Sequence, residues 1–188
     1  DSGGDSDADT VTINITDNGI QTVPADAITF QTTTKSILGL QPEDNADLVS
    51  LQPVDPDGND IANRNGMPQN MIYGLMDIKV KVDIPGSSTT VTVLLPEPAP
   101  QGYKWYKYSS SQGWYDYSTN VTFNGDRTRL TITLIDGGTG DDDGQQNGII
   151  EDPSGLGTAP AGSVSSGGGG GGGCFIDTLS THFTFFSF

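Results

Sequence analysis

The chain has 188 residues and a formal net charge of −16, with 24 acidic residues against 8 lysines and arginines. Such an excess of carboxylates repels a phosphate backbone, which argues against a nucleic-acid partner. A third of the residues are hydrophobic, enough to build a core, so the chain is not a disordered acidic polymer, and no apolar run approaches the roughly 20 residues that cross a bilayer.

Short runs of alternating Thr, Val, Ile and Tyr, separated by Gly, Pro, Asn and Asp, predict strands along most of the chain. Helical periodicity is nearly absent, so we expect an all-β fold: an antiparallel β-sandwich, Ig-like or jelly-roll-like, with long loops. Residues 43–69 contain several Pro and Gly and are expected to be irregular, with at most a short helix at 44–51. The predicted strands are 10–16, 28–33, 76–84, 89–95, 103–108, 114–117, 120–123 and 129–135.

Two turns are predicted from their residue types. Pro85-Gly86-Ser87 is expected to join 76–84 and 89–95 as a hairpin, since Pro and Gly supply the dihedral angles of a turn. Asn124-Gly125-Asp126 predicts a tight turn before the strand at 129–135.

The composition divides the chain into four segments. Residues 1–9 are an acidic N-terminal segment, and 10–153 are the expected sandwich domain. Residues 154–173 are rich in Ser and Gly and end in seven glycines, which predicts a linker because glycine loses the most backbone entropy when it is ordered. Residues 174–188 are apolar and are expected to form a glycine-tethered C-terminal strand.

Residues 71–160 carry a resemblance to a known family. Its densest parts are Tyr73-Gly74-Leu75, the run 91–98, Trp105-Tyr106-Lys107-Tyr108, Gly113-Trp114-Tyr115-Asp116, and the acidic run 136–153. This region resembles the choice-of-anchor U domain, a domain found near the C-terminus of secreted bacterial proteins just before a surface-anchoring or sorting segment. The resemblance implies an extracellular place at the bacterial cell surface and no assigned catalysis.

The glycine run followed by Cys174-Phe175-Ile176 is similar to the start of a tail found after such domains. The resemblance makes Cys174 a candidate attachment or processing residue.

The acidic run 136–152 is the strongest candidate site. It places oxygen donors at short intervals among glycines that permit sharp turns, and calcium takes six to eight oxygens from carboxylates, amides and backbone carbonyls. We therefore expect either a calcium site or a solvated acidic loop. The candidate metal ligands are Asp136, Asp141, Asp143, Asn147, Ile149 through its carbonyl, and Asp152.

Seven aromatic residues between 103 and 117 permit two interpretations. They could form a platform for carbohydrate, or they could pack on the sheet with Lys104 and Lys107 over their faces as cation–π partners, and packing is favoured. Catalysis has little support, because the single histidine, His182, and the single cysteine, Cys174, lie in the apolar tail without a third orienting group. We expect no enzymatic activity.

The C-terminal segment has three interpretations: a donor strand that adds to a neighbouring subunit, a strand of its own domain, or a sorting tail. A donor strand repeated head to tail would build a filament of identical subunits. The first expected function is therefore a structural surface module or filament subunit, and the alternative is a calcium-stabilised adhesin or glycan-binding module. The candidate partner-binding residues are Phe175, Ile176, Leu179, Phe183, Phe185, Phe186 and Phe188.

Overall fold

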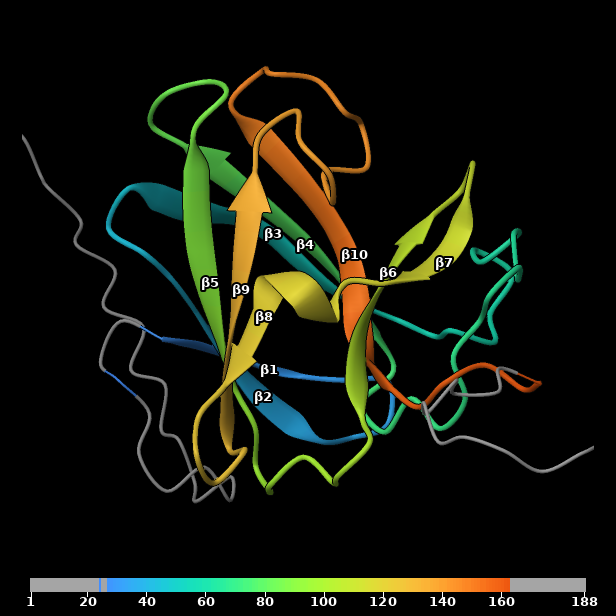
Figure 1. Ribbon diagram of the computed structural model, residues 1–188. Helices are drawn as coiled ribbons and strands as arrows, with labels where there is room; N and C mark the ends of the chain where they lie inside the picture. The colour runs from blue at the N-terminus through green and yellow to red at the C-terminus, as the bar shows by residue number, and fades with distance from the viewer. Residues whose placement is uncertain (1–23, 25–26, 163–188) are drawn as a thin grey trace, which may run out of the picture.

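The structure is a computed structural model that describes Pro24 and residues 27–162. It is a sandwich of two antiparallel five-stranded sheets, which confirms the predicted fold class. Figure 1 shows β5 and β9 of one sheet in front of β3, β4 and β10 of the other. The predicted strand at 10–16 and the predicted C-terminal strand at 174–188 lie outside the described residues.

The first sheet has the strand order β1-β2-β5-β9-β8. Hydrophobic residues alternate along its strands, so that one face of the sheet is buried against the other sheet. β8 and β9 pair across the predicted turn at 124–126, which confirms this turn. The strands are β1 (Ile28–Gln31), β2 (Ile37–Pro42), β5 (Ser88–Leu94), β8 (Val121–Phe123) and β9 (Arg129–Ile135).

The second sheet has the order β3-β4-β10-β6-β7. A short 3-10 helix, η1 (Ser118–Asn120), leads from its last strand back to the first sheet. No helix of the described part is long and apolar enough to cross a membrane. The strands are β3 (Ala46–Val54), β4 (Leu75–Val82), β6 (Lys104–Ser109), β7 (Gly113–Asp116) and β10 (Ile149–Gly157).

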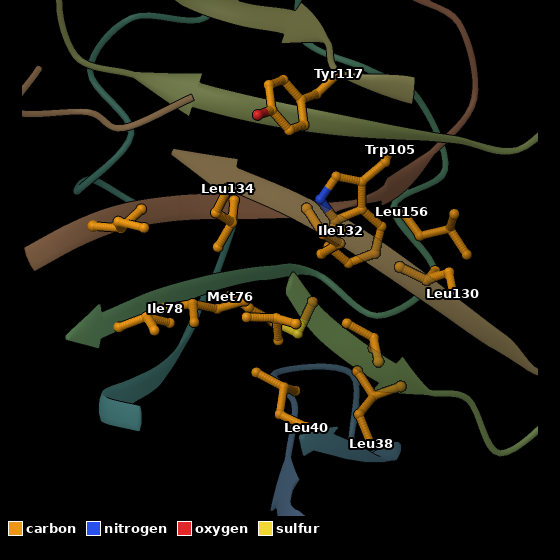
Figure 2. Packing of buried hydrophobic residues seen from close by; sticks show 14 of the residues in the cluster. Leu38, Leu40, Met76, Ile78, Trp105, Tyr117, Leu130, Ile132, Leu134 and Leu156 are labelled. Atoms are coloured by element: carbon orange, nitrogen blue, oxygen red, sulfur yellow. The ribbon is translucent and has the colours of Figure 1, made fainter. Parts of the chain in front are cut away.

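The core lies between the two sheets. Figure 2 shows Trp105, Tyr117 and Leu134 reaching into this interior from different strands and loops. A second, smaller cluster covers the outer face of the second sheet, where Ile61 of the long 55–74 loop packs with Trp114. The loop is held there by a hydrogen bond that the backbone N–H of Trp114 donates to the Asn65 carbonyl (2.8 Å).

The predicted hairpin between 76–84 and 89–95 is wrong. Both segments are strands, but β4 belongs to the second sheet and β5 to the first, so the turn at 85–87 carries the chain from one sheet to the other. A Pro-Gly turn reverses the chain locally, and it does not decide which strands then pair.

The predicted irregular region at 43–69, with its short helix at 44–51, is also wrong in its first part. Residues 46–54 form β3, with Pro53 inside it. β3 is an edge strand that pairs only with β4 among the described strands, and an edge strand tolerates a proline because one side of it needs no N–H donor.

β10 was not predicted, and it extends through Gly157 into the segment for which a linker was predicted. Pro153 lies inside it, at a point where β10 pairs with β4 alone, because pairing with β6 begins at Ser154. A proline therefore fits even though β10 is a central strand of the sheet.

Candidate functional site

A lysine and an aspartate face each other inside the sandwich. Lys107 lies on β6 and Asp152 on the neighbouring strand β10, and their side chains are 1% and 0% exposed. The Lys107 Nζ atom lies 2.9 Å from Asp152 Oδ1. In the strand register Lys107 is opposite Ser154 of β10 and opposite Tyr115 of β7, so it occupies the middle of three strands. We call this group the buried ion pair.

The local sequence explains why this lysine points inward. Successive side chains of a strand face opposite sides of the sheet, so Lys107 shares the inner face with Trp105, whereas Tyr106 and Tyr108 pack in the outer cluster. On β10 the same alternation places Asp152 on the inner face with Ile150 and Leu156.

Two further contacts hold the Lys107 ammonium. It donates a hydrogen bond to the Gly140 carbonyl (2.5 Å) and lies 4.4 Å from the centre of the Tyr117 ring, which confirms the predicted cation–π role of this lysine. The Tyr117 hydroxyl in turn donates a hydrogen bond that is shared between the carbonyl oxygens of Thr133 (3.0 Å) and Thr139 (2.9 Å). These contacts hold the loop after β9 over the buried ion pair.

Gly140 has to be a glycine. Its φ of +100° is strained for other residues, and a Cβ atom there would lie 2.7 Å from the Tyr117 ring. The close approach brings the Gly140 carbonyl within reach of Lys107.

Burial dominates the electrostatics of the site. It lowers the pKa of Lys107, and the charge of Asp152 opposes this shift. Burial also raises the pKa of Tyr115 to about 12, with a further contribution from the negative charge of Asp152. Asp152 Oδ1 has the close contact with Nζ, whereas Oδ2 receives no hydrogen bond from a described residue.

Asp136 and Asp141, two of the predicted metal ligands, accept hydrogen bonds from backbone N–H groups. Asp136 Oδ2 accepts hydrogen bonds from the N–H groups of Gly86 (2.6 Å) and Gly148 (3.0 Å), and so joins the β4–β5 connection to the start of β10. Asp141 accepts from the N–H groups of Gly137 (2.8 Å) and Glu151 (2.9 Å). Burial raises the pKa of Asp141, and these two donors oppose the shift.

Asp143, Asn147 and Ile149 form the outer part of the loop. Asp143 accepts a hydrogen bond from the Asn147 side-chain amide (2.8 Å), and Asn147 accepts one from the Ile149 N–H (2.7 Å). The structure thus divides the six predicted ligands among backbone contacts, the outer loop, and the buried ion pair. Within the described residues, no group of three or more His, Cys, Asp or Glu side chains is placed to hold a metal ion.

The predicted aromatic cluster is mostly buried. The exposures of Trp105, Tyr106, Tyr108, Trp114 and Tyr117 are all 7% or less, so these rings pack in the two cores. The ring centres of Tyr108 and Trp114 are 5.2 Å apart across β6 and β7. Lys104, the other predicted cation–π residue, forms an ion pair with Asp116 (2.6 Å) at the surface.

The buried ion pair itself was missed by sequence reasoning, which used Lys107 only as a ring partner and Asp152 only as a metal ligand. The sequence does contain a signal for the lysine: Lys107 comes two residues after Trp105 in an apolar strand, so the two side chains share one face of the sheet. Chemically, the pair brings an amine and a carboxyl group together where water is excluded. Comparison of the chain with protein-family models, curated proteins and solved structures finds no match.

Proposed function

We propose that this chain is a non-enzymatic structural module of a bacterial surface protein or surface filament, outside the cell. The observation that carries the proposal is that the sandwich uses its interior charges for cohesion. Lys107, Asp136, Asp141 and Asp152 are 7% exposed or less, and their contacts join strands and loops of the same domain. Charged groups that are buried and bound within the domain in this way stabilise a structural scaffold.

The resemblance to choice-of-anchor U domains supports the same proposal. The resembling region, residues 71–160, includes seven of the ten strands, from β4 to β10, so it belongs to the sandwich and is not a separate appendage. Domains of that family precede a surface-anchoring segment, and here the segment that follows is the glycine run and residues 174–188.

Within this proposal, residues 174–188 bind to a sheet edge of a neighbouring subunit. Strand addition uses backbone hydrogen bonds for affinity and side-chain pockets for register. Among the strands β1, β3, β7 and β8, which are edge strands within the described part of the chain, β3 is the longest at 9 residues, against 4, 4 and 3 residues for the others. Its Val49 is 55% exposed. We therefore propose β3 as the acceptor edge.

Assembly of the full chain tests the proposal. Size-exclusion chromatography at two concentrations and negative-stain electron microscopy should show polymers, and removal of residues 174–188 should abolish them. The charge-adding variant Phe183→Asp/Phe185→Asp should do the same, because a charged side chain is costly to bury. The matched control Ser180→Asp/Ser187→Asp adds the same charge at polar positions and should still assemble.

Val49→Lys tests the acceptor edge, because a lysine on an edge strand opposes strand addition. It should reduce assembly and leave the melting temperature of the monomer unchanged. A full chain that stays monomeric at both concentrations contradicts the filament, and polymers that persist without residues 174–188 contradict the donor strand. A deletion that only lowers the melting temperature of a monomer assigns the segment to its own domain.

A further inference from the structure

The buried ion pair is an unstable arrangement for two charges. Removing an ammonium and a carboxylate from water costs several kcal/mol for each ion, and mutual attraction repays this only when hydrogen bonds satisfy the remaining atoms. Here Asp152 Oδ1 has the close contact with Lys107 Nζ, but Oδ2 receives no hydrogen bond from a described residue. We propose that Lys107 and Asp152 react to form an intramolecular amide bond between Nζ and Cγ, which joins β6 to β10.

The geometry favours this reaction. The Nζ atom lies 2.9 Å from a carboxyl oxygen, and both side chains are held by strands that pair directly with each other. Two reacting groups fixed in contact behave as if their concentration were very high, which removes most of the entropic cost of joining them. No cofactor or further reactant is needed.

Burial of the two side chains supports the same step. Water is excluded from both side chains, which are 1% and 0% exposed, so the reverse hydrolysis is disfavoured.

The step balances within the pair. A proton moves from the Lys107 ammonium to the Asp152 carboxylate, which leaves a neutral amine and a carboxylic acid. The nitrogen lone pair attacks Cγ, the bond between Nζ and Cγ forms, and one bond between Cγ and an oxygen breaks. That oxygen leaves as water with the transferred proton and a second proton from the nitrogen. The remaining N–H can still donate to the Gly140 carbonyl, its present acceptor.

Two other ion pairs of the sandwich serve as internal controls. Lys79 and Glu151 lie 2.5 Å apart on β4 and β10, but their side chains are 35% and 33% exposed. The hydrogen bond to Glu151 raises the pKa of Lys79, and that to Asp116 raises the pKa of Lys104. These amines are solvated, so we expect no amide at either pair in spite of the short distance. The difference lies in burial.

Intact mass spectrometry of the full chain under denaturing conditions tests the proposal. The measured mass should be lower than the formula mass by one water molecule. Lys107→Met, which removes the nucleophile, should restore the formula mass, whereas Lys79→Met, the matched control on the exposed pair, should keep the loss. This test does not depend on assembly, so its failure leaves the proposed surface function standing.

Tryptic mapping of the wild-type chain locates the bond and does not require any variant to fold. An amide at Lys107 blocks cleavage there and links the peptide 105–127 to the peptide 130–188, which contains Asp152. A wild-type mass equal to the formula mass overturns the proposal. So does a water loss that maps to an Asp-Gly sequence such as Asp143-Gly144, where a cyclic imide also releases water and where Lys107→Met would retain the loss.

Discussion

Tyr115 and Tyr117 line the buried ion pair, and their rings meet edge to face at 6.4 Å. Tyr115 lies opposite Lys107 in the register of β6 and β7, with its phenol half-buried. Ionisation of this phenol would place a negative charge in a poorly solvated position close to Asp152. The titration of the Tyr115 phenol therefore reports on the environment of the buried ion pair.

We predict that alkaline pH destabilises the protein through Tyr115. Burial raises its pKa from 10.0 to about 12, so the unfolded chain releases this proton before the folded chain does. The stabilisation is complete below pH 10.0 and is lost as pH rises through about 12. Phenolate absorbance and circular dichroism should be recorded along the same titration.

The Tyr115→Phe variant is the control for this titration. It should lack the phenolate that appears near pH 12, because Phe has no ionisable hydroxyl. If the phenolate signal that Tyr115→Phe removes appears in the folded wild-type protein at the ordinary value of 10.0, the burial of Tyr115 is contradicted.

β10 connects the two halves of the second sheet, since it pairs with β4 along one side and with β6 along the other. Its C-terminal half contains Gly155 and Gly157, against which the chain around Gly74 and Pro68 packs directly. Asp152 belongs to this strand as well. Close packing of β10 thus also positions the buried ion pair.

Gly155→Ala should destabilise the protein by about 1–3 kcal/mol, the usual cost of overpacking. A Cβ atom at this position would lie 2.6 Å from the Gly74 carbonyl oxygen and 2.7 Å from Met71 Cε, and the backbone oxygen cannot move away cheaply. Urea unfolding followed by circular dichroism measures the change.

Gly125→Ala is the matched control for Gly155→Ala. No atom lies within 4 Å of the added Cβ, and the residue has no positive φ. Alanine there restricts the unfolded chain and should leave stability unchanged or raise it by about 0.4–1 kcal/mol. Equal losses in the two variants would contradict the tight packing of β10.

The two strands that differ from the sequence predictions, β3 and β10, share one cause. β3 and β10 each contain a proline, and Ser154–Gly157 is made of small residues and one leucine. Pro and Gly predict loops because they disfavour an isolated strand. In the sandwich they are accepted, since β3 is an edge strand and the glycines of β10 admit a close neighbour.

At the scale of the whole molecule, the net charge of −16 opposes folding through self-repulsion. Added salt screens exposed charges over about 8–10 Å at physiological ionic strength, so sodium chloride should raise the melting temperature. Calcium binding at the acidic loop stays a prediction. A test of it must distinguish general screening of the charges by salt from binding of calcium at a specific site.

The comparison of calcium with magnesium at equal ionic strength makes this separation. A ligand that binds only the folded state raises stability by mass action, so a calcium site raises the melting temperature more with calcium than with magnesium. Asp143→Asn, at the exposed end of the loop, should reduce the difference. If the melting curves with calcium, with magnesium, and with chelator plus sodium chloride coincide, the prediction of a calcium site is wrong.

The sequence by itself determined the all-β class, the two-sheet architecture and most strand positions, because alternation of apolar side chains is a local property of the chain. It placed Asp136, Asp141 and Asp152 among six candidate metal ligands, and this role stays a prediction. The spacing from Trp105 indicates that Lys107 faces inward, but it does not predict Asp152 as the partner.

Only the tertiary structure decided which sheet each strand joins and which charges meet. Pairing depends on the fit of whole faces, so β4 and β5 separate into different sheets despite the turn between them. Lys107 and Asp152 are 45 positions apart along the chain, and they come within 2.9 Å because β6 and β10 are neighbours. Burial then makes their chemistry differ from that of the exposed pairs, since solvent exclusion is a property of the packed sandwich.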